Sequence, residues 1–262
     1  MQSTPTVSPP SPLANMWVLI SLELSRAFTS RQGLIYLGAF SFFSYLFIDY
    51  GIVPFAFTRA EQGGSLLEAI FQNYYSLATY GFPILCLFLA ANQTAPDRER
   101  GTLRFISLRC SRDEIFFSRF ISQVLIQLIF IFISLAFLVA VATYQQGYDS
   151  NSLPYALLAL INTGIVILPF IGLMALVSVL VKQPRQATFY AGLIWALSSI
   201  IMGLIEKYVP VLAPLNILVL GMQFSNLTEL DGAAKFSLAY VAFLQCAVLL
   251  LAGRFFMGRK SL

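Results

Sequence analysis

Apolar residues gather in six stretches of this chain, separated by shorter polar segments. The stretches run over residues 32–53, 69–93, 120–144, 153–181, 187–205 and 236–253. Each is close to the length of about 20 apolar residues that a helix needs to cross a bilayer. Pro83 and Pro169 lie inside the second and fourth stretches, where we expect the helices to kink. The pattern predicts an all-α integral membrane protein with six transmembrane helices in a single domain, residues 13–262.

Two segments precede the first predicted span. Residues 1–12 are rich in Pro, Ser and Thr, which predicts a disordered tail. In residues 13–31 the apolar side chains fall on one helical face, at Leu13, Met16, Trp17, Ile20, Leu24, Ala27 and Phe28. The charged residues Glu23, Arg26 and Arg31 would be costly inside the hydrocarbon of the bilayer. We therefore expect an amphipathic interfacial helix on the membrane surface rather than an extension of the first span.

A further apolar stretch, within residues 208–230, is interrupted by two prolines and a glycine. The distribution of positive charge decides how this stretch is interpreted. With six spans, Lys and Arg concentrate on the side that holds both termini, and the exceptions are Arg59, Lys207 and Lys235. Because basic residues favour the cytoplasmic side of a membrane, we expect both termini in the cytoplasm. Residues 208–230 are then an external re-entrant element between the fifth and sixth spans.

The composition agrees with a membrane protein and argues against several kinds of site. Hydrophobic residues make up 58% of the chain and charged residues 11%, against about 45–50% and 25% in soluble domains. The sequence has no histidine and no C-x-x-C pair, which argues against a haem, zinc or other metal site. It also lacks the G-x-x-x-x-G-K-[ST] run that binds nucleotide phosphates. We expect no cofactor on this chain, no enzymatic activity of its own and no nucleic-acid partner.

The most charged segment, residues 94–118, lies between the second and third predicted spans. Acidic residues alternate there with arginines, and Ser111 and Glu114 have the spacing of a capping box. The pattern predicts a short helix, a sharp break and a second helix that continues into the third span. Three interpretations compete: a solvated loop that contacts anionic lipid head groups, a docking element for a soluble partner, and a substrate-binding patch. The interleaved acids favour docking, because lipid binding needs only basic residues.

Three runs of this sequence resemble those of a known family. The type-2 ABC exporter permeases carry an E-x-G-T-L run between their second and third spans, which resembles Asp97-Arg98-Glu99-Arg100-Gly101-Thr102-Leu103. Their S-R pair at the foot of the third span resembles Ser111-Arg112, and their membrane-entry helix resembles residues 23–31. Cys110 and Arg119 stand where many members have Pro and Lys, respectively. The resemblance extends over nearly the whole chain.

This resemblance implies a permease subunit of an ATP-driven exporter in a bacterial inner membrane, with a coupling helix inside residues 94–118. Two such subunits would pair, either as two copies or with a paralogous permease, and two ABC ATPase subunits would bind ATP and Mg²⁺. The residues expected at the ATPase contact are Asp97, Glu99, Arg100, Gly101, Thr102, Leu103, Arg104, Ser111, Arg112, Lys182 and Arg185. Lys182 and Arg185 equally suit an ordinary basic loop. The alternative function for the same fold is a membrane scaffold or assembly factor without transport.

Two polar residues, Gln123 and Gln127, lie one turn apart on the third predicted span. Hydrogen bonding between helices is the usual role of such residues in a membrane. A translocation path is the alternative role for this pair. Membrane lipids are expected to contact the remaining surface of the spans.

Overall fold

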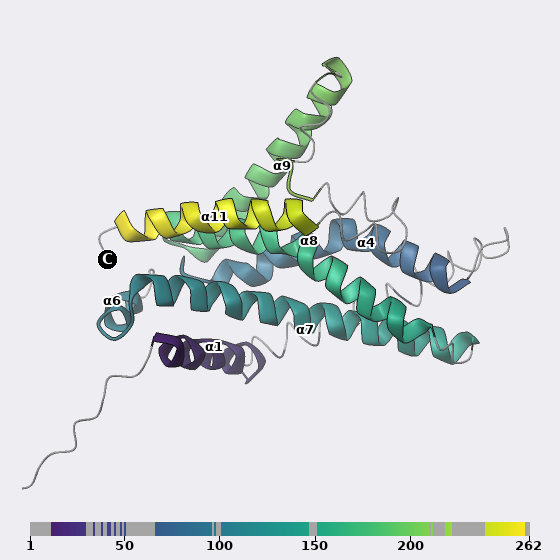
Figure 1. Cartoon of the computed structure of the whole chain (residues 1–262), viewed down its shortest axis with the longest axis horizontal. Coiled ribbons are helices and arrows are strands. Elements are labelled where there is room, and N and C mark those ends of the chain that lie inside the picture. Colours follow the sequence, from purple (N-terminus) through teal and green to yellow (C-terminus); the bar gives the residue numbers. More distant parts are fainter. Residues whose placement is uncertain are drawn as a thin grey trace, which may run out of the picture.

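The computed structural model describes a bundle of long helices. The described residues are 12–29, 66–95, 97, 101–146, 151–209, 211, 218–221 and 239–259, with isolated positions between 34 and 50. Their helices follow in the order α1 (Pro12–Thr29), α4 (Leu66–Leu89), η2 (Ala90–Asn92), α6 (Thr102–Ser107), α7 (Arg112–Gln146), α8 (Ser152–Leu180), α9 (Pro184–Tyr208) and α11 (Ala239–Arg259). Figure 1 shows α7, α8 and α11 running side by side, with α4 against α8 and α1 against α7.

Helix α8 forms the centre of this bundle. It packs against α11, α7, α4 and the start of α9, and most of its side chains are buried. Its sequence is apolar on every face, as expected of a helix with neighbours around its whole circumference. The α8 backbone at Gly172 lies near α11, because a Cβ placed there would be in van der Waals contact with the Cβ of Leu249 at 3.4 Å. Small residues at such a crossing allow two helices in a membrane to pack backbone against backbone.

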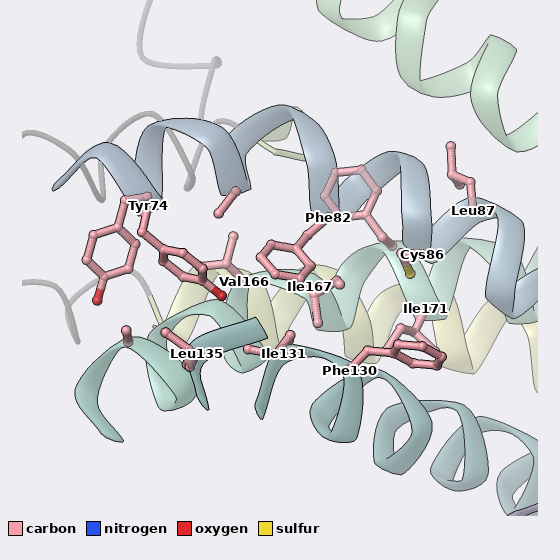
Figure 2. Packing of buried hydrophobic residues seen from close by; sticks show 14 of the residues in the cluster. Tyr74, Phe82, Cys86, Leu87, Phe130, Ile131, Leu135, Val166, Ile167 and Ile171 are labelled. Carbon is pink, nitrogen blue, oxygen red and sulfur yellow. The ribbon is translucent and has the colours of Figure 1, made fainter. Parts of the chain in front are cut away.

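The main hydrophobic core lies where α4, α7 and α8 meet. Phe82 and Cys86 of α4 point toward Ile131 of α7 and toward Ile167 and Ile171 of α8 (Figure 2). None of these five side chains is more than 5% exposed. The two prolines expected inside spans lie within helices, one in α4 and one in α8. This core joins α4, which precedes the charged segment, to α7 and α8, which follow it.

Four of the described helices are long and apolar enough to cross a membrane: α7, α8, α9 and α11. They correspond to the third to sixth predicted spans, and α11 continues past the predicted end at residue 253 to Arg259. Helices α4 and η2 occupy the second predicted span. The first, residues 32–53, lies mostly outside the described residues, although the described positions from Leu34 to Tyr45 are helical. The protein is thus a multi-pass helical membrane protein, and the count of six spans stays a prediction.

Helix α9 leaves the bundle at a steep angle (Figure 1). Its buried residues are Ala187 and Ala191, both near its start. Part of the predicted re-entrant element packs on it, because the indole N–H of Trp195 donates a hydrogen bond to the carbonyl of Leu220 at 2.9 Å. Gly221 follows with a φ of 97°, a conformation that favours glycine. Residues 212–217 and 222–230 of the predicted re-entrant element lie outside the described part of the chain.

Helix α1 lies along α7, and the structure divides its predicted apolar stripe between two faces. Leu24, Ala27 and Phe28 pack against the main core. Leu13 and Trp17 instead face outward, together with exposed apolar residues that the stripe did not include. A helix with one apolar face on protein and another on its surroundings suits the predicted interfacial position. The predicted helix extends to residue 31, whereas α1 ends at Thr29 and Arg31 lies outside the described residues.

Candidate functional site

The charged segment after the second span forms an elbow at one end of the bundle. We use this name for residues 94–119, of which residues 96 and 98–100 lie outside the described part of the chain. Figure 1 places α6, the start of α7 and the end of α11 at this end of the molecule. The elbow therefore lies close to the second and third spans, to the last span and to α1.

The turn between α6 and α7 contains the capping box that the sequence predicts. The backbone N–H of Glu114 donates to Ser111 Oγ at 3.2 Å. In return, the backbone N–H of Ser111 donates to Glu114 Oε2 at 2.8 Å. These bonds satisfy donors that the start of a helix leaves without intrahelical partners. Helix α7 consequently begins at Arg112, well before the apolar stretch that starts at residue 120.

The start of α6 depends on a glycine. Gly101 precedes the helix with a φ of 72°, in the left-handed region that other residues avoid. A Cβ at this position would meet nothing within 4 Å, so the backbone conformation and not a close neighbour requires glycine here. The regular part of α6 is short, Thr102–Ser107. Ala95 and Asp97, ahead of the Gly101 turn, are also helical.

A buried ion cluster joins the elbow to α1. The guanidinium of Arg119, on α7, forms ion pairs with Glu23 of α1 through Nη1 and with Asp97 through Nη2. The three side chains are 7%, 12% and 9% exposed, respectively. Buried charges persist only when they are paired and hydrogen-bonded, and the planar fork of arginine can hold two carboxylates at once. The sequence placed all three charges in water or at the membrane surface, whereas the structure buries them against one another.

Thr102 connects this ion cluster to α6. Its hydroxyl donates a hydrogen bond to Asp97 Oδ1 at 3.0 Å. Asp97 in turn accepts from Arg119, which also holds Glu23. A continuous set of polar contacts therefore runs from the first residue of α6 to the middle of α1. Arg26 approaches the same cluster from outside, with Nη1 3.9 Å from Glu23 Oε1 and its side chain 58% exposed.

Beneath the elbow lies a second apolar cluster that joins five helices. Its buried members are Ile115 and Phe116 of α7, Ala175 and Val179 of α8, and Met257 of α11. Leu19 of α1 and Ile106 of α6 pack against it, together with Cys110. Ile106 and Cys110 thus turn inward from the elbow, and for Leu103 the structure describes only the backbone.

The outer face of the elbow exposes two large apolar side chains. Phe105 of α6 is 73% exposed, and Leu108, in the turn that follows, is 82% exposed. Arg109 beside them is also exposed. Both apolar residues project from a short helix whose own core contacts, through Ile106, are on the opposite side. Sequence reasoning did not single them out, because an exposed Phe and a buried Phe look alike in a short helix with weak periodicity.

The remaining residues expected at an ATPase contact are distributed around this end of the bundle. Lys182 is exposed in the link between α8 and α9, and Arg185 is exposed in the first turn of α9. This link lies near the elbow, since Val179 just before it belongs to the second apolar cluster. Glu99 and Arg100 lie outside the described residues, and only the backbone of Arg104 is described. Arg112 contacts α11 instead of projecting outward, with its Nη1 2.9 Å from the carbonyl oxygen of Gly258.

The two glutamines of the third span face the interior of the bundle. Gln123 is 6% exposed and Gln127 is 1% exposed. Gln123 Oε1 and Gln127 Nε2 have no hydrogen-bond partner among the described residues. Both interpretations of this pair, helix packing and a translocation path, stay predictions.

Cys110 occupies the break between α6 and α7. Burial raises the pKa of its thiol above the ordinary value, and the negative charge of Glu114 adds to the rise. The thiol is therefore protonated at neutral pH and a weak nucleophile. The structure assigns Cys110 a packing role at the turn where the resembling family often has proline.

The family of this chain is shown by a comparison with known protein families. A family model for ABC-2 family transporter proteins matches residues 17–216, which include most of α1, the elbow, α7, α8 and α9. The chain belongs to the ABC-2 family of transporter proteins. A comparison with curated proteins finds no match.

Membership of the ABC-2 family gives the chain its general role. It is the membrane-embedded permease component of an ABC transporter, a class in which nucleotide binding belongs to associated ATPase subunits. The matched range, residues 17–216, includes α1, the elbow and α9. Helix α11 lies beyond that range, so its contacts with the elbow are known from this structure alone.

Proposed function

We propose that this ABC-2 permease is half of an ATP-driven exporter, working as a dimer with two separate ATPase subunits that bind the elbow. On this proposal the elbow lies in the cytoplasm of a bacterial inner membrane, with both termini on the same side. Each ATPase binds ATP and Mg²⁺, and its closure pushes on α6. The elbow then carries that displacement into α7.

The observation that carries this proposal is the exposed apolar pair Phe105 and Leu108, presented on a rigidly held support. Large apolar side chains exposed on a short helix are typical anchors of a protein interface. The ion cluster around Arg119 and the second apolar cluster hold the base of that helix. A lipid-binding loop would not need this rigidity. The basic residues Lys182 and Arg185, exposed at the same end of the bundle, are proposed as a smaller second contact.

Purification with and without this pair tests the proposal. Phe105→Ser together with Leu108→Ser leaves the fold intact, since both side chains are exposed. Loss of an anchoring side chain costs about 2 kcal/mol or more of binding free energy, roughly 30-fold in affinity, at a typical interface hot spot. We expect the wild-type permease to co-purify with an ATPase in equal amounts, and the double variant to lose it.

Tyr144→Ser is the matched control. Tyr144 is 92% exposed but lies near the other end of α7, far along the helix from the elbow. This variant should retain the ATPase. The proposal fails if the wild-type chain purifies without any nucleotide-hydrolysing partner, or if the elbow variant retains its partner as firmly as Tyr144→Ser does.

A further inference from the structure

The last turn of α11 is capped by the first turn of α7. The final carbonyls of a helix have no intrahelical donors. Arg112 supplies one, because its Nη1 donates to the carbonyl of Gly258 at 2.9 Å and lies 3.3 Å from that of Met257. A cation at this position also suits the negative end of the helix dipole. Arg112 thus serves the permease's own last span.

A second, reciprocal contact lies beside the first. Asp113, in the first turn of α7, accepts from Arg254 of α11 through both carboxylate oxygens, at 3.1 Å from Nε and 2.6 Å from Nη2. Asp113 is an acid in the first turn of α7, where the helix dipole favours negative charge, and it shares that charge with Arg254 of the other helix. We call these four groups, Arg112, Asp113, Arg254 and the carbonyls of residues 257–258, the α7–α11 clasp.

Close apolar packing supports the clasp from inside the bundle. A Cβ at Gly253 would lie 2.6 Å from Cζ of Phe116, so the phenyl ring rests directly on the α11 backbone. Met257, one turn further, is buried with Phe116 in the second apolar cluster. Polar contacts at the surface and a ring seated on a glycine below them restrain α11 in two directions. The end of α11 and the foot of α7 are therefore held as one body.

From these contacts we propose that the elbow drives the last span directly through the α7–α11 clasp, with Arg112 as the positioning residue. This inference rests on the proposed function, since it needs an ATPase to move the elbow. The inference gives Arg112 a different role: the residue contacts α11 and not the ATPase. Because α11 packs along most of its length on α8, displacement of α11 also reaches the centre of the bundle.

The test follows α11 by its distance from α9, a helix that has few contacts with the rest of the chain. Spin labels are attached at Leu251→Cys on α11 and Leu204→Cys on α9, both exposed positions, after the native cysteines are replaced by alanine. The permease–ATPase complex is placed in lipid vesicles. The interlabel distance is measured without nucleotide and with MgATP and vanadate, and ATP hydrolysis is measured on the same sample.

With an intact clasp, we expect MgATP and vanadate to shift the interlabel distance. Arg112→Gln and Asp113→Arg should abolish that shift while ATP is still hydrolysed. The charge swap Asp113→Arg with Arg254→Asp should restore it, because the ion pair between α7 and α11 then forms again with its charges exchanged. Arg259→Gln is the control, because it removes a positive charge from the same turn of α11 while its guanidinium lies 4.1 Å from the Phe255 ring instead of on α7.

The possible failures are distinguishable. A distance shift that persists in Arg112→Gln and Asp113→Arg overturns the inference and leaves the proposed function standing. So does a wild-type complex that hydrolyses ATP with no shift at all. If no ATPase binds the wild-type chain, the proposed function fails first. Should Arg112→Gln not fold, the charge-swap pair alone decides the question, because half-exposed ion pairs contribute little to folding.

Discussion

Arg119 is the residue on which the elbow most depends. It lies near the start of α7. Its guanidinium forms ion pairs with Asp97 and with Glu23, which lies far earlier in the sequence. Lysine, which many members of the resembling family have here, would place one ammonium where two carboxylates must be reached. The guanidinium instead addresses each acid with a separate nitrogen. One side chain thereby fixes the relative positions of α1, α7 and the start of the elbow.

Removal of this charge should be strongly destabilising. Arg119→Gln leaves two buried carboxylates facing each other, and loss of one partner from a buried ion pair typically costs about 3–5 kcal/mol. Arg119→Lys keeps the charge and should cost less. The thermal unfolding midpoint of the detergent-purified protein measures both effects.

Arg26→Gln provides the comparison at the edge of the same cluster. Arg26 is 58% exposed and 3.9 Å from Glu23, so its loss should cost below about 1 kcal/mol. Equal midpoints for the Arg119→Gln and Arg26→Gln variants would contradict the buried cluster.

At this scale the sequence predicted bonds between near neighbours better than contacts between distant residues. Ser111 and Glu114 form the predicted capping box because three residues of separation set their geometry. Asp97 was expected only as part of the charged segment, and its ion pair with Arg119 was not predicted. Nothing in the spacing of Glu23, Asp97 and Arg119 indicates that folding brings them together. Phe105 and Leu108 were missed for a related reason, since exposure depends on which neighbours cover a short helix.

At the scale of helices, α11 shows how one glycine sets the distance between two elements. Phe116 of α7 occupies the space that a side chain at Gly253 would need. The ring is 2% exposed, so it cannot swing away without opening the second apolar cluster. The absence of a side chain at Gly253 is therefore a packing requirement at the base of the clasp.

Alanine substitution separates packing from helix propensity. Gly253→Ala should lower stability by about 1–3 kcal/mol, the usual cost of overpacking a core, even after the gain of about 1 kcal/mol in helix propensity. Gly258→Ala gains the same helix propensity, and its Cβ would meet nothing within 4 Å, so this variant should not be less stable than the wild type. Thermal unfolding in detergent compares the two variants, and a Gly253→Ala protein as stable as Gly258→Ala would disprove the close contact.

The spans that the sequence predicted best are those with the longest uninterrupted apolar runs. The third to sixth predicted spans correspond to α7, α8, α9 and α11. The capping box predicted that the third helix would begin before its apolar run, and α7 does begin at Arg112, whereas α11 ends at Arg259, beyond the predicted end at residue 253. Arg112 and Arg254 lie where α7 and α11 extend beyond their apolar runs, and the clasp joins the two helices there. Composition alone places the end of a span at the first charge, and tertiary contacts move it.

For the whole molecule, the side on which the C-terminus lies decides whether residues 208–230 form an external re-entrant element or a seventh span. With six spans, the elbow and both termini share one side, and the positive-inside bias makes that side cytoplasmic. Two C-terminal fusions measure the location of the C-terminus directly. One strain carries a reporter that is active only outside the cytoplasm, and a second strain carries a cytoplasmic fluorescent reporter. We expect fluorescence from the second fusion and no activity from the first.

The same pair of fusions after residue 230, beyond the predicted re-entrant element, should give the opposite result. A C-terminal fusion active outside the cytoplasm would refute the six-span topology.

The arrangement of the helices in the bundle could not be predicted from the sequence, because apolar runs indicate which segments cross the membrane and not which of them become neighbours. The central position of α8 and the outward course of α9 follow from packing between distant segments.

The ion cluster around Arg119 also dictates an order of events during synthesis. A ribosome makes Glu23 and Asp97 before it makes Arg119, so both acids leave the exit tunnel without their partner. Until the third span has been translated, each carboxylate is stable only in water, and α1 cannot settle against a helix that does not yet exist. Arg254 emerges later still, after α8 and α9 have been made. The elbow is therefore completed only after α11 has been made, and a polypeptide cut short by premature termination before α11 would lack it in working form.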